Sequence, residues 1–190
     1  MRGGQSLAVG SRAPYVDNAP GELQLLAQAK FGNAVSVSNK GVPGAALHDA
    51  LNGLPPYYAA TLQQRLASDP SKIVIENFAI NDATRTDPEE FRSDLTTWVD
   101  VVRAAGKIAV LEEPNPICTT EADKVRQLAV IVDEVALAKA APLIQQHSYI
   151  SSLDGWHSML VDCVHPTDTL YRIKAEREYS VIAPIISSLL

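Results

Sequence analysis

The sequence contains only two cysteines, Cys118 and Cys163, and aromatic residues make up only 6% of it. Two cysteines are too few for a disulfide framework, and their spacing does not fit a metal site. No apolar run approaches the ~20 residues that a membrane-spanning helix requires, and the 16 Lys and Arg residues form no cluster along one face. These absences argue against a disulfide-stapled scaffold, a membrane span and a nucleic-acid-binding surface.

The composition is that of an ordinary globular protein. Of the 190 residues, 46% are hydrophobic and 20% are charged, and the formal net charge is -6. This length is enough for one full hydrophobic core, so we expect a single domain over residues 1–190. The negative charge favours a small neutral or cationic substrate over nucleic acid or an anionic membrane. The sequence does not determine the oligomeric state.

The first residues of the chain show no targeting signal. Residues 1–4 lead into no signal-peptide core, so we expect a soluble chain without an export signal. The compartment stays open, because a truncated N-terminus would leave secretion or the periplasm as alternatives.

Hydrophobic periodicity predicts alternating strands and helices. Apolar residues recur at helical spacing in several segments, and short apolar runs separate them. We expect helices over residues 20–31, 45–52, 56–67, 87–106, 120–140 and 167–189, and strands over residues 34–38, 72–78, 107–112 and 142–145. Strands that alternate with helices form a parallel sheet covered on both faces, since the crossovers are right-handed. The predicted fold class is therefore α/β.

Asp162 stands three residues before His165, just ahead of the last expected helix. An imidazole works as a general base near its free pKa of ~6.5, and a neighbouring carboxylate fixes its tautomer and stabilises the imidazolium. The two residues are therefore a candidate catalytic base and its orienting acid. The alternative is that they cap the helix that begins near Pro166 and Thr167, because helix starts favour acids and Pro.

Polar turns follow two of the expected strands. Gly44 lies in the turn after the strand at 34–38, and Asn81 follows the strand at 72–78. In α/β folds the turns at the carboxyl ends of the strands form the active crevice. Simple turn roles stay open for both residues, because glycine suits tight turns and Asn often bonds its own backbone.

The chain resembles the SGNH hydrolases, which are the GDSL-type esterases and lipases of flavodoxin-like three-layer α/β/α fold. The resemblance lies in these turns and in the segment at 162–166, Asp-Cys-Val-His-Pro. The resemblance covers essentially the whole chain, and three of the family's four sequence blocks appear in the right order. It implies His165 as the catalytic base and Asp162 as the acid that orients it. It also implies that the Gly44 backbone N–H and the Asn81 side-chain amide donate to the oxyanion of the tetrahedral intermediate.

The family's first block, Gly-Asp-Ser-Leu after the first strand, has one match here, at residues 4–7. Ser6 is therefore the candidate nucleophile, and its backbone N–H is a further candidate oxyanion donor. Gln5 replaces the family's Asp, and so little chain precedes the motif that we expect a truncated first strand. Three alternatives stay open: a truncated chain, another segment in the position of the first strand, or Ser6 in a plain loop with the nucleophile lost upstream.

Other residues carry weaker signals. Ala79 stands where the family usually has Gly, two residues before its Asn, and we expect its methyl group to narrow the substrate pocket. Trp156, just ahead of the Asp-His segment, either walls the acyl pocket or packs in the core. Cys118 and Cys163 belong to loops at the same edge of the sheet, so they could form a disulfide in an oxidising compartment. Two buried free thiols are the alternative.

The resemblance thus predicts a serine ester hydrolase that works through an acyl-enzyme without a cofactor or metal. It implies a small-molecule carboxylic ester as substrate, with a short acyl chain or an acetylated sugar. The alternative is a catalytically incomplete SGNH-like domain that binds a carbohydrate or ester without turnover. A flavodoxin-like cofactor-binding protein fits less well, because no phosphate-cradling loop follows a strand. We expect structural roles for His48 and His147 and a buried acid at Glu76.

Overall fold

The computed structural model describes residues 2–7 and 18–190, with the backbone alone for residues 2–7. Five parallel strands form one sheet in the order β2-β1-β3-β4-β5. The strands are β1 (Arg2–Leu7), β2 (Ser36–Asn39), β3 (Ile73–Asn77), β4 (Ile108–Glu112) and β5 (Leu143–Ile144). Because all five strands are parallel, their carboxyl ends meet at one edge of the sheet, where ligands bind in such folds.

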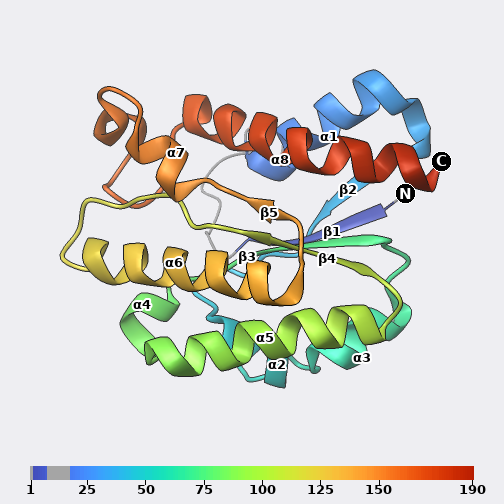
Figure 1. Cartoon of the computed structure of the whole chain (residues 1–190), viewed down its shortest axis with the longest axis horizontal. Coiled ribbons are helices and arrows are strands. Elements are labelled where there is room, and N and C mark those ends of the chain that lie inside the picture. Colours follow the sequence, from blue (N-terminus) through green and yellow to red (C-terminus); the bar gives the residue numbers. More distant parts are fainter. Residues whose placement is uncertain (1, 8–17) are drawn as a thin grey trace.

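Strand β1 lies in the interior of the sheet, between β2 and β3 (Figure 1). Gly3 pairs with Val37 of β2, and Ser6 pairs with Glu76 of β3. The prediction of a short first strand is confirmed, and residues 2–7 themselves fill its place. The backbone of Ser6 belongs to this strand and not to a loop, while its side chain lies outside the described part of the structure.

Helices cover both faces of the sheet and give three layers (Figure 1). On one face, α1 (Ala19–Phe31) and α8 (Asp168–Leu189) pack together, and their shared core includes Leu23 and Ala175. The opposite face carries α2 (Leu47–Asn52), α3 (Leu62–Ser68), α5 (Pro88–Ala104) and α6 (Ala122–Lys139). The predicted α/β/α architecture is confirmed.

Short elements connect these layers. α4 (Asp82–Arg85) follows β3, α7 (His147–Ser151) follows β5, and 3-10 turns span Gly32–Ala34 and Trp156–Met159. Among the helices of the described residues, none is long and apolar enough to cross a membrane.

Capping side chains set the starts of α1 and α5. The Asn18 side chain accepts a hydrogen bond from the Gly21 N–H (3.0 Å), and the Asp87 side chain accepts one from the Glu89 N–H (2.9 Å). Such caps satisfy N–H groups that the first turn of a helix leaves unpaired. Because these signals are local, both helices lie close to the ranges that the sequence predicts.

The helix predicted over residues 56–67 is shorter in the structure and begins at Leu62. Thr61 caps it: the Gln64 N–H donates to the Thr61 hydroxyl (3.3 Å), and the Thr61 N–H donates to the Gln64 side chain (3.0 Å). Residues 54–60 form turns and bends, although Tyr57 and Tyr58 extend the apolar pattern. The capping box therefore decides where this helix starts, and the apolar periodicity alone overestimates its length.

Candidate active site

The loop that leads into α8 holds Asp162 and His165 in direct contact. His165 Nδ1 lies 2.8 Å from Asp162 Oδ2 and 3.0 Å from Oδ1. The backbone N–H groups of His165 and Val164 also donate to Asp162 Oδ1, at 2.8 and 3.2 Å. The bonds from the His165 backbone and ring lower the pKa of Asp162 to about 2. The carboxylate is therefore ionised at neutral pH, and because it engages Nδ1, Nε2 is the ring atom that can accept a proton.

Neither residue of this pair caps α8. The N-cap residue of α8 is Thr167, whose side chain makes no capping hydrogen bond, and Asp162 accepts from the Val164 and His165 N–H groups, which precede the helix. The capping interpretation of Asp162 and His165 is therefore wrong. The His165 side chain is 39% exposed, so a small substrate can approach the imidazole from solvent.

Two side-chain links tie the base-bearing loop to the segment after β4. Cys118 and Cys163 form a disulfide, with their Cα atoms 4.8 Å apart, and the Cys118 N–H donates to the Cys163 carbonyl (2.9 Å). The buried Asn115 donates from Nδ2 to the Val164 carbonyl (3.2 Å). Cys163 has a φ of 66°, which is unfavourable for most side chains. The links therefore hold the loop in a shape that local preference alone would not maintain.

Gly44 and Asn81 lie on loops that a hydrogen bond joins. The Asn81 side-chain amide donates to the Ala45 carbonyl (3.0 Å). Gly44 has a φ of +79°, and a Cβ added there would lie 3.3 Å from Tyr57 Cε1. Backbone conformation and space therefore both favour glycine at this position. The two predicted oxyanion residues follow β2 and β3, the strands on either side of β1, and this hydrogen bond holds their loops close together.

The two predicted pocket residues differ in their surroundings. Ala79 is completely buried and has a φ of 92°, a conformation in which glycine is far less strained. Its methyl group therefore does not narrow an open pocket, contrary to the prediction. Trp156 is half-buried, stacks on the His157 ring with 3.8 Å between centroids, and packs against the buried cluster of Ile150, Leu160 and Leu170. Its role as a pocket wall stays a prediction.

The chain matches the model of the GDSL-like lipase/acylhydrolase family over residues 4–173. The chain belongs to this family. The matched region includes the five residues singled out for catalysis: Ser6, Gly44, Asn81, Asp162 and His165. A search of curated protein sequences finds no match.

Solved structures with the same fold include the lipase/acylhydrolase from Enterococcus faecalis, which is 21% identical, has a TM-score of 0.77, and aligns over 97% of this chain and 96% of that one. The acetyl xylan esterase AlAXEase is 13% identical, with a TM-score of 0.79 and coverage of 96% and 100%. The psychrotrophic esterase EstA from Pseudoalteromonas sp. is 16% identical, with a TM-score of 0.76 and 98% coverage of both chains. At these identities the likeness establishes a shared fold.

As a member of the GDSL-like lipase/acylhydrolase family, the protein is a carboxylic ester hydrolase. A serine nucleophile is typical of this family. Ser6 lies toward the carboxyl end of β1, and Asn81 follows the carboxyl end of the adjacent β3. These parts of the predicted site therefore share one edge of the sheet.

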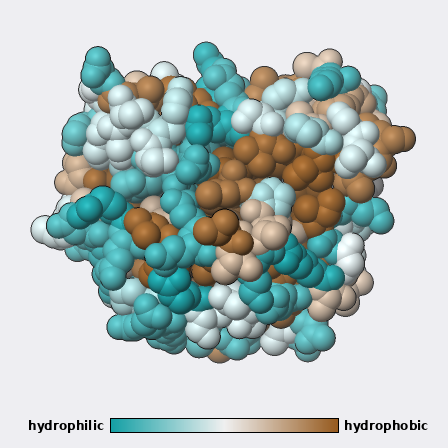
Figure 2. Space-filling model, in the orientation of Figure 1, coloured by the Kyte–Doolittle hydropathy of each residue, from teal (hydrophilic) through white to brown (hydrophobic). Residues whose placement is uncertain are grey.

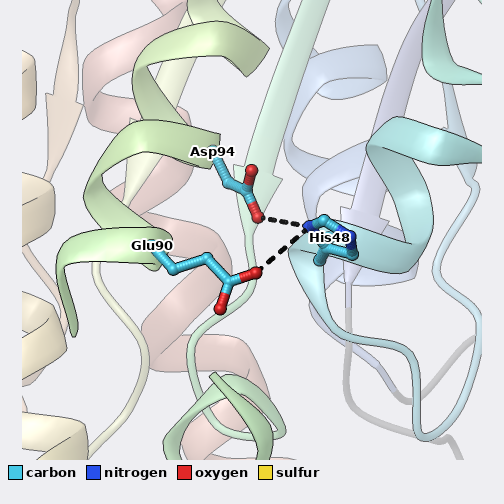
Figure 3. Close-up of side chains that lie close together, drawn as sticks. All are labelled: His48, Glu90 and Asp94. Carbon is cyan, nitrogen blue, oxygen red and sulfur yellow. Dashed lines mark hydrogen bonds and ion pairs between the residues drawn. The ribbon is translucent and has the colours of Figure 1, made fainter. Parts of the chain in front are cut away.

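His48, Glu90 and Asp94 meet where α2 packs against α5 (Figure 3). His48 Nδ1 lies 3.0 Å from Asp94 Oδ2 and 3.7 Å from Glu90 Oε1. Within residues 18–190 this is the one group of three side chains close enough to hold a metal ion. The hydrogen bond between His48 and Asp94 joins the two helices and accounts for the arrangement, which fits the structural role predicted for His48.

Glu76 of β3 is a buried acid, as predicted. Its Oε1 accepts a hydrogen bond from the Phe78 N–H (2.6 Å), and no described residue bonds its Oε2. Burial raises the pKa of Glu76 to about 8, with further upward effects from Asp82 and Glu112. The sequence gives no sign of a second buried pair, Glu112 and Lys174, whose charged atoms lie 3.4 Å apart, because the two residues are distant along the chain.

We expect Glu76 to make the protein less stable as the pH rises. Its folded-state pKa of about 8 lies above the ordinary value of 4.5, so its contribution to stability is full below pH 4.5 and is lost as the pH rises through 8. The side chain in Glu76→Gln stays neutral at every pH. The difference in free energy of unfolding, variant minus wild type, should therefore rise by up to ~1.4 kcal/mol per pH unit between the two pKa values. Urea unfolding at about pH 5, 7 and 9 measures this difference.

The exposed Glu89 provides the control for this experiment. Glu89→Gln should show the same pH dependence of stability as the wild type. If the difference between Glu76→Gln and the wild type stays constant from pH 5 to 9, the buried carboxyl does not titrate in this range and the prediction is wrong.

Proposed function

We propose that this protein hydrolyses carboxylic esters through an acyl-enzyme, with Ser6 as nucleophile, His165 as general base and Asp162 as orienting acid. The observation that carries the proposal is the Asp162 carboxylate bound to His165 Nδ1 at 2.8 Å, in a loop fixed to the segment after β4. The proposed oxyanion donors are the backbone N–H groups of Ser6 and Gly44 and the side-chain amide of Asn81.

In the proposed cycle, Ser6 Oγ attacks the ester carbonyl carbon while its proton passes to His165 Nε2. The tetrahedral intermediate then collapses, and the alcohol leaves with the proton held by His165. A water molecule attacks the acyl-enzyme while its proton passes to His165 Nε2, and His165 returns this proton to Ser6 Oγ as the bond to the acyl group breaks and the carboxylic acid departs. Asp162 remains ionised throughout, because its lowered pKa lies far below neutral pH.

We propose a short acyl group, as in acetate esters or acetylated sugars, for the substrate. The support is the fold shared with a protein named as an acetyl xylan esterase and the position of the large Trp156 side chain on the segment that leads into the base-bearing loop. A wall of this kind would favour a small acyl chain over a long one.

A second candidate function is binding of a carbohydrate or ester without turnover. The observation in its favour is Gln5, which stands where the family's nucleophile block has Asp. In that case the protein would bind its ligand and form no covalent adduct.

A p-nitrophenyl ester series from acetate to octanoate tests the proposed function together with a fluorophosphonate probe. We expect the highest kcat/KM with the shortest esters and a single adduct, located on Ser6 by peptide mass spectrometry. Ser6→Ala should lose both turnover and labelling, because it lacks the attacking oxygen. Ser180→Ala, on the exposed surface of α8, should keep both.

The two functions give different results in this experiment. Turnover with labelling at another residue would show that Ser6 is not the nucleophile. Absence of both turnover and labelling, combined with saturable binding of an acetylated sugar, would support the binding function instead.

A further inference from the structure

Arg85 reaches from α4 back to the loop that carries Gly44. Its Nη1 donates to the Gly44 carbonyl (3.0 Å). The same guanidinium pairs with Asp49 of α2, with Nη1 2.8 Å from Oδ2 and Nη2 3.1 Å from Oδ1, and it lies 5.1 Å from the centre of the Tyr57 ring. A bidentate pair with a carboxylate fixes the plane of a guanidinium, so the direction of its third bond, to Gly44, is also fixed.

Asp49 is well placed to orient Arg85. Its side chain is only 6% exposed, and its Oδ2 also accepts a hydrogen bond from the Ala46 N–H (2.9 Å). The Asp49 carboxylate therefore binds both the Arg85 guanidinium and the backbone that follows Gly44. Because little solvent competes at Asp49, this pair is better ordered than an ordinary surface ion pair.

Three side chains of α4 and the residue before it bind the backbone of residues 44–47. Arg85 binds the Gly44 carbonyl, Asn81 binds the Ala45 carbonyl (3.0 Å), and Asp82 accepts from the Leu47 N–H (2.8 Å). A glycine with positive φ has many accessible conformations, and a bond to its carbonyl restricts them. The bond from Arg85 is the one that acts on Gly44 itself.

We infer that Arg85, oriented by Asp49, is a positioning residue: by binding the Gly44 carbonyl it fixes the backbone of Gly44, whose N–H is the proposed oxyanion donor. The inference rests on the proposed function, in which Gly44 donates to the oxyanion. Arg85 acts through Gly44 and does not touch the reacting atoms. Since the oxyanion forms only after substrate has bound, loss of this restraint lowers kcat and leaves KM nearly unchanged.

The chain offers a matched control in Arg92 on α5. Its side chain is 35% exposed, against 38% for Arg85, and it also pairs with a carboxylate, that of Glu134. Arg92→Ala therefore removes an arginine of similar exposure whose ion-pair partners, Glu89 and Glu134, lie outside the Gly44 loop. Arg85→Ala should lower kcat for p-nitrophenyl acetate by roughly 10-fold to 100-fold, since loss of a whole oxyanion donor typically costs ~10²–10³. Arg92→Ala should leave kcat within about twofold of the wild type.

Two further measurements separate positioning from a general loss of structure. Guanidinium ion at low millimolar concentration should restore part of the kcat of Arg85→Ala, because it can occupy the space between Asp49 and the Gly44 carbonyl. Asp49→Asn should also lower kcat, by a smaller factor than Arg85→Ala does. The double variant should have a kcat close to that of Arg85→Ala alone, since the two residues act as one unit. Asp49→Asn also serves as the test variant if Arg85→Ala does not fold.

Hydrogen–deuterium exchange tests the same restraint without turnover. Peptides that cover residues 42–47 should exchange faster in Arg85→Ala than in the wild type and should be unchanged in Arg92→Ala. Unchanged exchange in Arg85→Ala overturns the inference, as does an unchanged kcat in an active enzyme. If the wild type hydrolyses no ester, the proposed function fails, and the exchange data still decide whether Arg85 holds the loop.

Discussion

Replacement of His165 by alanine should lower kcat for ester hydrolysis by about 10²–10⁴-fold, the usual contribution of a general base. The variant should fold, because the His165 side chain is partly exposed and its recorded side-chain partner is Asp162 on the same loop. The measurement is kcat and KM with p-nitrophenyl acetate, together with urea unfolding. His157→Ala is the matched control, because His157 is also a histidine in the segment ahead of α8, stacked on Trp156.

Asp162→Asn should cost less activity than His165→Ala. An asparagine at this position can still accept the backbone N–H bonds of Val164 and His165 through one oxygen, but it no longer stabilises the imidazolium that forms when His165 takes a proton. Full activity of His165→Ala would exclude His165 as the base. An equal loss in His157→Ala would point to disruption of the loop.

Loss of the disulfide should lower both stability and activity. The bond between Cys118 and Cys163 closes a loop with a sequence separation of 45 residues, so its removal should cost about 2–4 kcal/mol of unfolding free energy. It should also lower kcat, because Cys163 lies between Asp162 and His165 and its backbone conformation is unfavourable without the tether. The expected size of the kcat effect is smaller than that of His165→Ala, since Asn115 still bonds the loop.

Urea unfolding and ester hydrolysis with and without dithiothreitol measure these effects, with a thiol count in the unfolded protein to establish the redox state. The double variant Cys118→Ser, Cys163→Ser should resemble the reduced wild type and should not respond to the reductant. Two free thiols in the protein before reduction, with a stability that the reductant does not change, would show that the bond does not form in solution.

The sequence by itself determined the α/β class and most of the helices and strands. These features depend on local signals: the apolar periodicity of α5 and α6, the Asn18 and Asp87 caps, and the buried run of β3. The Asp162–His165 contact could also be predicted from the sequence. Its two members are three residues apart, so a short loop is enough to bring the carboxylate to the imidazole.

The tertiary structure alone decided the features that join distant parts of the chain. β1 gains its interior place only by pairing with β2 and β3, because six residues with two glycines carry little strand signal of their own. The bond from Arg85 to Gly44, which spans 41 residues, and the disulfide between Cys118 and Cys163 also depend on contacts between distant parts of the chain. Such contacts form when the packed sheet brings its loops to a common edge, and no local pattern specifies which partner each side chain will meet.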